Sequence, residues 1–182
     1  MDISRLEEKQ VSSKEIYDGY ILHVREDKIL LPDGRDAKRE LIRHIGAVCV
    51  IPVNENNEVI MEHQYRYPIS DVVLEIPAGK LDSADEDRLE AAKRELREET
   101  GYTADNWTDI GMYIPAPAYS DEKINMYLAT GLHLGERELD DDEFIDVCTI
   151  PLAKLVDKVM AGEITDGKTQ IAIMKAANML LM

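Results

Sequence analysis

The run GAVCVIPV, residues 46–53, is the feature that most constrains how this chain can fold. It contains no charged or amide side chain. A continuous apolar run of this length is typical of a buried strand at the centre of a sheet. The NENNE segment that follows, residues 54–58, predicts a hairpin turn, and VIMEHQYRYP, residues 59–68, predicts the returning strand. The sequence therefore indicates a domain built around a buried sheet.

The residues before this run predict a second, smaller sheet. Apolar and polar side chains alternate in YILHV and again in DKILL. The Pro-Asp-Gly sequence at 32–34 is a turn signal between two strands. We therefore expect a small antiparallel sheet within residues 1–43, ahead of a main domain that spans residues 44–182.

The clearest helix is predicted over residues 85–100. Leu89, Ala92 and Leu96 recur at helical spacing and form an apolar stripe, and Gly101 is a natural residue to end the helix. Two more helices are predicted near the C-terminus, in PLAKLVDKVMAG and in KTQIAIMKAANMLLM. The second is apolar almost all round, so we expect it to be buried in the domain or against a second subunit.

Charge and composition exclude several classes of protein. The 182 residues carry a net charge of −16, which argues against a nucleic-acid-binding protein, because such surfaces are rich in Lys and Arg. An acidic protein that handles anionic phosphates needs a cation between itself and the substrate. The opening MDISRLEEKQVSSKE has no apolar core, and no apolar run approaches the roughly 18 residues of a membrane span. We expect a cytoplasmic protein without membrane contacts, in which Cys49 and Cys148 are buried reduced thiols.

Three carboxylates crowd the end of the predicted helix, where KRELREETGY contains Glu95, Glu98 and Glu99. Glu95 and Glu99 are four residues apart and share a helix face, with Glu98 roughly 60–80° round from each. Glu99 lies at the edge of the apolar stripe, where a carboxylate is costly unless it is paired or bound to a metal. One interpretation is a solvated charged face with Lys and Arg partners. The other is a platform for Mg²⁺, which prefers carboxylate oxygens.

The same region resembles the box of the Nudix hydrolases, G-x5-E-x7-R-E-U-x-E-E-x-G-U, in which U is a bulky apolar residue. GKLDSADEDRLEAAKRELREETGY, residues 79–102, matches it with one extra residue between Gly79 and Glu86. We interpret this as an insertion in the loop before the helix, so that either Asp85 or Glu86 pairs with Arg94. The remaining matched positions are Glu95, Leu96, Glu98, Glu99, Gly101 and Tyr102.

Further segments resemble the ADP-ribose pyrophosphatase branch of that family: EIPAGKLD, HQYRYP, PAYSDE and the small N-terminal sheet. Members commonly have a proline about fifteen residues after the box, and Pro117 lies fifteen residues after Tyr102. The resemblance implies an α/β (α+β) fold, a Nudix-type α/β/α sandwich with a mixed sheet, preceded by the small antiparallel sheet. It also implies a homodimer in which the N-terminal sheet contributes to the partner's site.

The resemblance assigns residues to a metal site. It implies that Glu95 and Glu99 bind Mg²⁺, with Mn²⁺ as the alternative ion. Glu98 is a third carboxylate candidate, and the backbone carbonyl of Ala78 is a further ligand. The cation would neutralise the pyrophosphate and lower the pKa of a bound water. Structural roles fall to Glu86, Arg94, Gly79 and Gly101.

The resemblance also implies a base that comes from a late acidic loop, ELDDDEFIDV. Glu143 is the first choice there and Asp141 the second. Glu122 in YSDE and Glu98 are the other catalytic candidates. A nucleotide substrate needs a stacking surface and Arg contacts to phosphate. The expected substrate-binding residues are Arg66, Arg39, Tyr20 and Pro117.

The activity that the resemblance implies is Mg²⁺-dependent hydrolysis of ADP-ribose to AMP and ribose 5-phosphate. The resemblance implies that the box recognises only the pyrophosphate part of the substrate. Another nucleoside diphosphate sugar such as GDP-mannose, or a dinucleotide, is therefore an alternative substrate. A Nudix domain that binds a ligand without catalysis is a further alternative. That alternative predicts missing box carboxylates, and here all of them are present.

Overall fold

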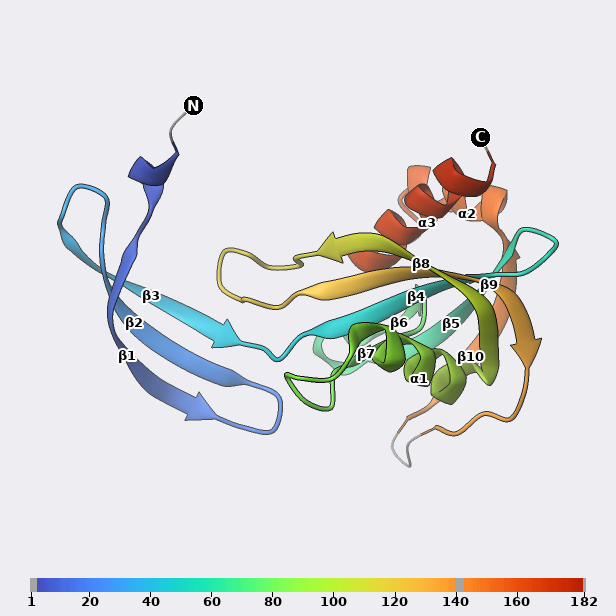
Figure 1. Cartoon of the computed structure of the whole chain (residues 1–182), viewed down its shortest axis with the longest axis horizontal. Coiled ribbons are helices and arrows are strands. Elements are labelled where there is room, and N and C mark those ends of the chain that lie inside the picture. The colour runs from blue at the N-terminus through green and yellow to red at the C-terminus, as the bar shows by residue number, and fades with distance from the viewer. Residues whose placement is uncertain (1–2, 140–142, 182) are drawn as a thin grey trace. The chain divides into compact units, whose positions relative to one another are not determined.

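The computed structural model of the chain describes residues 3–139 and 143–181. The chain divides into two compact units, each with its own β-sheet (Figure 1). The first unit comprises Met1–Ile45 and Ile114–Lys123, and the second comprises Gly46–Tyr113 and Ile124–Met182. A ten-residue segment of the first unit therefore interrupts the second unit in the sequence.

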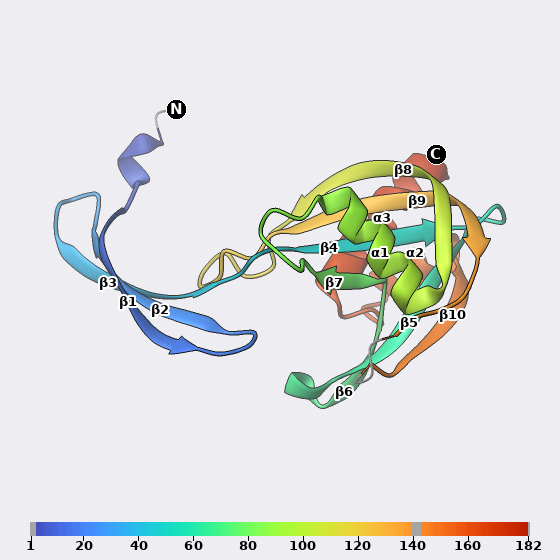
Figure 2. The same cartoon turned by 60° about the horizontal axis from the view of Figure 1, so that its bottom comes forward.

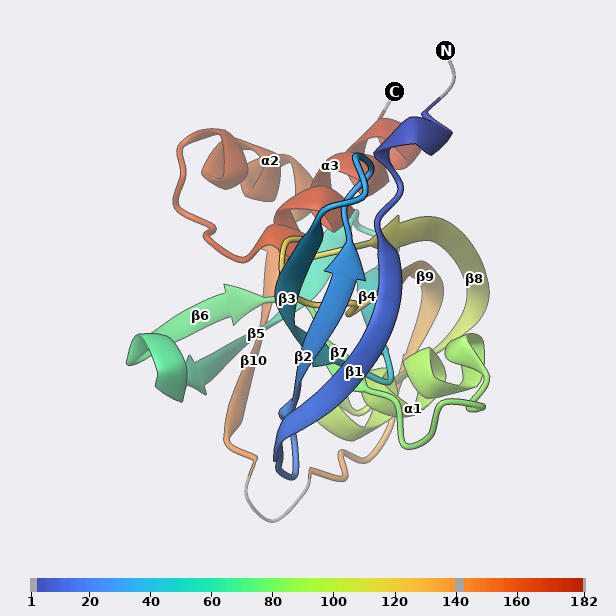
Figure 3. The same ribbon diagram turned by 90° about the vertical axis from the view of Figure 1, so that its left-hand side faces the viewer.

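The first unit is built on three antiparallel strands in the order β1-β2-β3 (Figure 3). These are β1 (Lys9–Asp18), β2 (His23–Leu30) and β3 (Asp36–Arg43), preceded by a short 3₁₀ helix, η1 (Ser4–Leu6). In the turn between β2 and β3, Gly34 donates its N–H to the carbonyl of Leu31 and has a φ of 86°, which favours glycine. The small antiparallel sheet predicted from the sequence is confirmed.

The segment Ile114–Lys123 is attached to the last strand of this sheet. Ile42 donates its N–H to the carbonyl of Tyr119, and its own carbonyl accepts a hydrogen bond from the N–H of Asp121. The Arg43 guanidinium adds an ion pair with Asp121 at 2.9 Å. Among the described residues of this unit, Ile29 is the only buried hydrophobic side chain. The unit therefore has little core of its own.

The second unit contains a seven-stranded mixed sheet in the described chain. Its strands are β4 (Ala47–Val53), β5 (Glu58–Arg66), β6 (Asp71–Glu75), β7 (Ala78–Lys80), β8 (Tyr102–Tyr113), β9 (Ile124–Leu134) and β10 (Ile145–Pro151), with a 3₁₀ helix, η2 (Tyr67–Ile69), between β5 and β6. The main path is β10-β5-β4-β9-β8. β4 pairs with β5 only at Val53 and Val59, after which β7 pairs with β4 and β6 pairs with β5. Only β4 and β9 are parallel.

Helices cover both faces of this sheet. α1 (Arg88–Thr100) lies on one face, and α2 (Leu152–Met160) and α3 (Gly167–Leu180) lie on the other (Figures 1 and 2). β4 is buried throughout, and its side chains alternate between the two layers. Val48 and Val50 pack on the side of α1, whereas Cys49 and Ile51 pack on the side of α2 and α3. The expected α/β/α sandwich with a mixed sheet and a buried central strand is confirmed.

Caps set the limits of α1. The carboxylate of Asp87 accepts hydrogen bonds from the N–H groups of Leu89 and Glu90, which makes Asp87 the N-cap. Gly101 ends the helix with a φ of 77°, a left-handed conformation that costs glycine little. The predicted helix started at residue 85, three residues too early, because the preceding loop continues to this N-cap.

The C-terminal helix is buried along one face within this chain, and its other face exposes the apolar side chains of Met174, Met179 and Leu180. Ala172 and Ile173 of α3 are buried, but Met174 is exposed. Cys49 is a buried free thiol as expected, whereas Cys148 is free and only half-buried. In the part of the chain that the structure describes, no helix is both long enough and apolar enough to cross a membrane.

Candidate metal and catalytic site

The carboxylates of Glu95 and Glu99 on α1 face the sheet instead of water. Ala92 and Leu96 are fully buried on the side of the helix that packs on β4, and they fix its rotation. As a result Glu95 is 8% exposed and Glu99 is 2% exposed. These two side chains are therefore not part of a solvated charged face.

The short strand β7 receives both carboxylates. The N–H of Ala78 donates a hydrogen bond of 2.9 Å to Glu99 Oε2. At Gly79 a β-carbon would lie 2.0 Å from Glu95 Oε1, so the carboxylate rests directly on the glycine backbone. Glycine is needed here for this close approach.

A cation does lie among the crowded carboxylates, and it is Arg94. Its guanidinium contacts Glu95 Oε1 at 2.9 Å, Glu98 Oε2 at 3.1 Å and Glu86 Oε1 at 3.3 Å. Although burial opposes its charge, the neighbouring carboxylates, with Glu95 foremost, raise the pKa of Arg94. Glu86 also accepts a hydrogen bond of 2.7 Å from the N–H of Asp82. The loop before α1 is thus tied to the helix through Glu86.

A second charged layer lies on β5 and β6. Glu75 and Glu62 are direct partners in the antiparallel register of these strands. Arg66 forms a two-pronged contact with Glu75, through Nε to Oε1 at 2.7 Å and Nη2 to Oε2 at 2.9 Å. Lys168 of α3 also donates to Glu75 and lies 3.1 Å from Asp166. Arg66, expected to bind substrate, is thus anchored to a buried carboxylate.

Glu62 is the least satisfied side chain of the site. It is 0% exposed, and neither of its carboxylate oxygens has a hydrogen-bond partner among the described residues. Burial, followed by the neighbouring charge of Glu75, raises the pKa of Glu62. Lys168 and Arg66 act in the opposite direction, but both are already bound to Glu75.

The pKa values of Glu95 and Glu99 on α1 are raised as well. Burial raises the pKa of Glu95 to about 7, against the opposing effect of Arg94. Burial and then the charge of Glu62 raise the pKa of Glu99, and the hydrogen bond from Ala78 only partly compensates. No cationic side chain of the described residues lies within 4.0 Å of Glu62 or Glu99. The site therefore has an excess of buried negative charge.

This donor set fits a hard divalent cation. The side chains that carry the excess negative charge all offer carboxylate oxygens, which are the ligands that Mg²⁺ and Mn²⁺ prefer. The unpaired oxygens of Glu62, and the lack of a Lys or Arg partner for Glu99 among the described residues, indicate that the site can accept further positive charge. Within residues 3–139 and 143–181, no three acidic, His or Cys side chains already form a metal-binding group. Arg94 instead holds Glu95 and Glu98.

Glu143, which precedes β10, acts electrostatically on the same carboxylates. Glu143 is half-buried, and its charge contributes to the raised pKa values of both Glu95 and Glu99. Asp141, the second candidate base, lies outside the described residues. The site of the second unit thus brings together Glu86, Arg94, Glu95, Glu98, Glu99, Ala78, Gly79 and Glu143.

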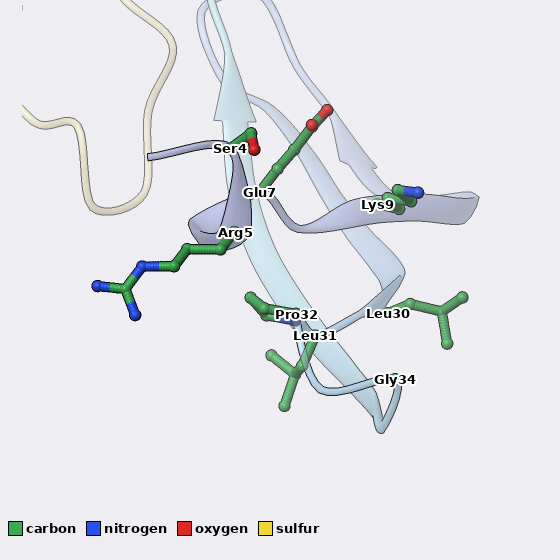
Figure 4. A pocket seen from close by; sticks show the side chains of 8 residues that line it. All are labelled: Ser4, Arg5, Glu7, Lys9, Leu30, Leu31, Pro32 and Gly34. Carbon is green, nitrogen blue, oxygen red and sulfur yellow. The ribbon is translucent and has the colours of Figure 1, made fainter. Parts of the chain in front are cut away.

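Four other predicted residues belong to the first unit. Glu122 Oε1 lies 3.9 Å from His44 Nε2. Arg39 donates from Nε to Glu8 at 3.0 Å. The remaining two, Tyr20 and Pro117, have exposed side chains. A pocket of this unit, lined by residues of the N-terminal segment and the β2–β3 turn, contains none of the predicted residues (Figure 4).

Sequence reasoning missed Glu62, Glu75 and Lys168. A signal for Glu62 was present, because Ile60 and Glu62 alternate with Val59 and Met61 in a strand that was predicted correctly. A carboxylate at an inward position of such a strand indicates a special environment. Lys168 had no comparable signal, because its contact with Glu75 joins residues 93 positions apart.

Comparisons with known proteins match both units. The family described as NUDIX domain matches residues 43–169, and that described as nucleoside diphosphate sugar hydrolase N-terminal domain matches residues 8–42. An ADP-ribose pyrophosphatase of Bacillus subtilis is 39% identical over 92% of this chain and 91% of its own length. A methanol dehydrogenase activator of Bacillus methanolicus is 38% identical over 92% and 91%.

The fold also matches a solved structure. A crystal structure of an ADP compounds hydrolase superposes with a TM-score of 0.85, covering 96% of this chain and 94% of that one, at 23% identity. At this identity the match concerns the fold.

Proposed function

The chain belongs to the NUDIX family, and on that premise we propose that it hydrolyses ADP-ribose to AMP and ribose 5-phosphate with a bound divalent cation. The observation that carries the proposal is the pair Glu95 and Glu99, buried on α1 against Gly79 and Ala78. The chain that presents this pair also resembles an ADP-ribose pyrophosphatase over nearly its whole length.

The ligands of the cation would be Glu95 and Glu99, with Glu98 and the carbonyl of Ala78 as further donors. Mg²⁺ is the first choice and Mn²⁺ the second, because all the donors are oxygens. When bound, the cation neutralises pyrophosphate oxygens and makes a bound water a better nucleophile. Arg94 would keep Glu86 and its loop on the helix, as the 3.3 Å contact between them supports.

In the reaction, a water oxygen bonds to one phosphorus of the pyrophosphate. The bond from that phosphorus to the bridging oxygen breaks, and the released phosphate leaves as part of the second product. Glu143 would accept the proton of the attacking water. Its electrostatic influence on both Glu95 and Glu99 supports a position on the same side of the site. A general base must come within hydrogen-bond reach of that water.

Arg66 is the proposed contact for a substrate phosphate. Two of its nitrogens are held by Glu75, which fixes the plane of the guanidinium. Among the described residues no partner binds the third nitrogen, Nη1, so a donor is left for an anionic oxygen. Tyr20 and Arg39 of the first unit are proposed for the adenine.

We also propose a homodimer. The first unit has one buried hydrophobic side chain among its described residues, whereas several large ones, including Ile16, Tyr17 and Tyr20, are exposed. A three-stranded sheet with so little core gains stability when a second surface covers it. A second copy of the chain would supply that surface.

A second candidate function keeps the chemistry and changes the substrate. The match of residues 8–42 to a nucleoside diphosphate sugar hydrolase domain supports that broader substrate class, and GDP-mannose is one member of it. A Nudix domain that binds without turnover is a third alternative. The retained carboxylates at positions 95, 98 and 99 argue against it.

The deciding experiment is product analysis after incubation of the purified full chain with Mg²⁺. The substrates are ADP-ribose, GDP-mannose, ADP-glucose and a diadenosine polyphosphate, and chelator-treated samples are the controls. We expect release of AMP from ADP-ribose with the highest kcat/KM of the panel. Preference for another sugar nucleotide would replace the substrate but keep the site, and absence of any turnover would favour the binding module.

A further inference from the structure

We propose that Glu62 of β5, which lies outside the helix that carries Glu95 and Glu99, is a further carboxylate ligand of the cation in this site. The inference rests on the proposed function, because it assumes that α1 binds a divalent cation. Its basis is the position, burial and lack of partners of Glu62.

The Glu62 carboxylate has no partner in the folded chain that the structure describes. The side chain is fully buried, and both of its oxygens are without a hydrogen-bond partner in the described chain. An ionised carboxylate in such a place strongly destabilises the fold unless something compensates for its charge. Buried polar groups with no partner are rare in folded proteins and point to a missing one, such as an ion.

Glu62 points to the face of the sheet that α1 covers. Val59 and Met61 of the same strand belong to the core on the side of α2 and α3. Because side chains alternate along a strand, Glu62 faces the opposite side, where α1 packs. Glu99 of α1 is buried on that side, and the charge of Glu62 is the strongest neighbouring charge acting on it. The orphaned carboxylate is therefore aimed into the carboxylate cluster.

The buried acids around Glu62 outnumber the cationic side chains that neutralise them. Three cations act on Glu62. Arg66 and Lys168 make their contacts to Glu75, and Arg137 donates to the carbonyl of Ile145. Glu62 and Glu99 are left as neighbouring buried acids without a cation of their own. Two like charges in one site destabilise each other. A divalent cation between them removes the repulsion.

Protonation of Glu62 is the competing explanation. A proton would neutralise the charge of Glu62, but its carbonyl oxygen would still lack a donor among the described residues. A cation satisfies the oxygens directly, because carboxylates bind Mg²⁺ or Mn²⁺ through them. The cation therefore accounts for both the charge and the missing partners.

The test measures metal binding separately from activity. Mn²⁺ binding to the chelator-treated full chain is followed by electron paramagnetic resonance and by calorimetry at pH 7.5. The variants are Glu62→Gln, which keeps the shape, and Glu62→Met, which removes the polar group. Glu58→Gln is the matched control, because Glu58 lies on the same strand but bonds to Asn54 outside the cluster.

We expect both Glu62 variants to bind Mn²⁺ at least about tenfold more weakly than the wild type and Glu58→Gln. We also expect their melting temperature without metal to be equal to or above that of the wild type, and its rise with Mn²⁺ to be smaller. Weaker Mn²⁺ binding together with an equal or higher melting temperature without metal distinguishes a metal ligand from a residue that only supports the fold.

Wild-type affinity in both variants would overturn the inference and leave the proposed function intact. Unfolding of both variants in the absence of metal would also overturn it, because it would give Glu62 a structural role. If the wild type itself binds no Mn²⁺, the proposed function fails before Glu62 is considered. The failures of the two proposals are thus distinguishable.

Discussion

The carboxylate of Glu95 rests on the backbone of Gly79, so closely that a β-carbon there would lie 2.0 Å from Glu95 Oε1. Gly79→Ala must therefore push the end of this side chain away. Because the displaced group is the tip of a side chain, we expect the fold to survive while kcat falls about 100-fold. Steady-state kinetics with ADP-ribose and circular dichroism check both parts. Gly135→Ala is the control, because its added β-carbon meets only an ordinary contact of 3.4 Å.

Glu99→Gln is expected to separate catalysis from stability. Turnover should fall by about two orders of magnitude or more, because a metal ligand is lost from the transition state. The chelator-treated variant should be at least as stable as the wild type, since a buried charge beside Glu62 is removed and the amide oxygen can still accept from Ala78. Thermal melts and kinetics are the measurements, and near-normal activity would refute the metal assignment.

Arg66→Lys tests the anchor on β5. Lysine cannot form the two-pronged contact with Glu75, so we expect the free energy of unfolding to fall by about 1–3 kcal/mol, less than for full removal because Lys168 still contacts Glu75. Urea unfolding gives this number, with Arg97→Lys as the exposed control. A rise in KM for ADP-ribose with unchanged stability would mean that phosphate binding is the only role of Arg66.

The raised pKa of Glu95 predicts how the free energy of unfolding depends on pH in the absence of metal. Burial raises its pKa to about 7 in the folded chain, against about 4.3 in an unfolded one. At pH values between these two pKa values, Glu95 holds more protons in the folded state than in the unfolded state. Glu95 therefore makes the free energy of unfolding fall as the pH rises. The stability of Glu95→Gln relative to the wild type should therefore increase by on the order of 2 kcal/mol from pH 5 to pH 8.

The measurement is urea unfolding of both proteins at four pH values with a chelator. Saturating Mn²⁺ should abolish the trend, because a bound cation favours the ionised carboxylate. A difference between the two proteins that does not change with pH would contradict the prediction.

The exposed apolar side chains of the first unit predict a dimer. Light scattering of the full chain at micromolar concentration should give twice the mass of the chain, and Ile16→Glu should shift it towards the monomer, because Ile16 is exposed on β1. Ser13→Glu on the same strand is the control for added charge. A monomeric wild type would rule out a site shared between two subunits.

Local patterns predicted the central strand, its hairpin partner and the helices of the second unit. The apolar run at 46–53 became the buried strand β4, and the stripe of Ala92 and Leu96 became the buried face of α1. The spacing of Glu95 and Glu99 placed them on one helix face, which is a property of helix geometry alone. The resemblance to the family supplied the fold around these elements, and the comparison with solved structures confirmed it.

Other features depended on contacts between distant segments. The segment Ile114–Lys123 belongs to the first unit because it bonds to Ile42, which no local pattern indicates. Arg66 was expected to face substrate, but its main partner is Glu75. The cation among the α1 carboxylates in this structure is Arg94, whose contact with Glu86 depends on how the inserted loop folds back on the helix.

The sequence by itself determined which elements form and which carboxylates share a helix face, because turn chemistry and side-chain periodicity act within a few residues. Only the tertiary structure decided which carboxylates are neutralised. Glu75 acquires Arg66 and Lys168, whereas Glu62 and Glu99 acquire no cation among the described residues. The charge on a buried acid depends on what the folded chain packs around it, and those neighbours come from strands and helices far apart in the sequence.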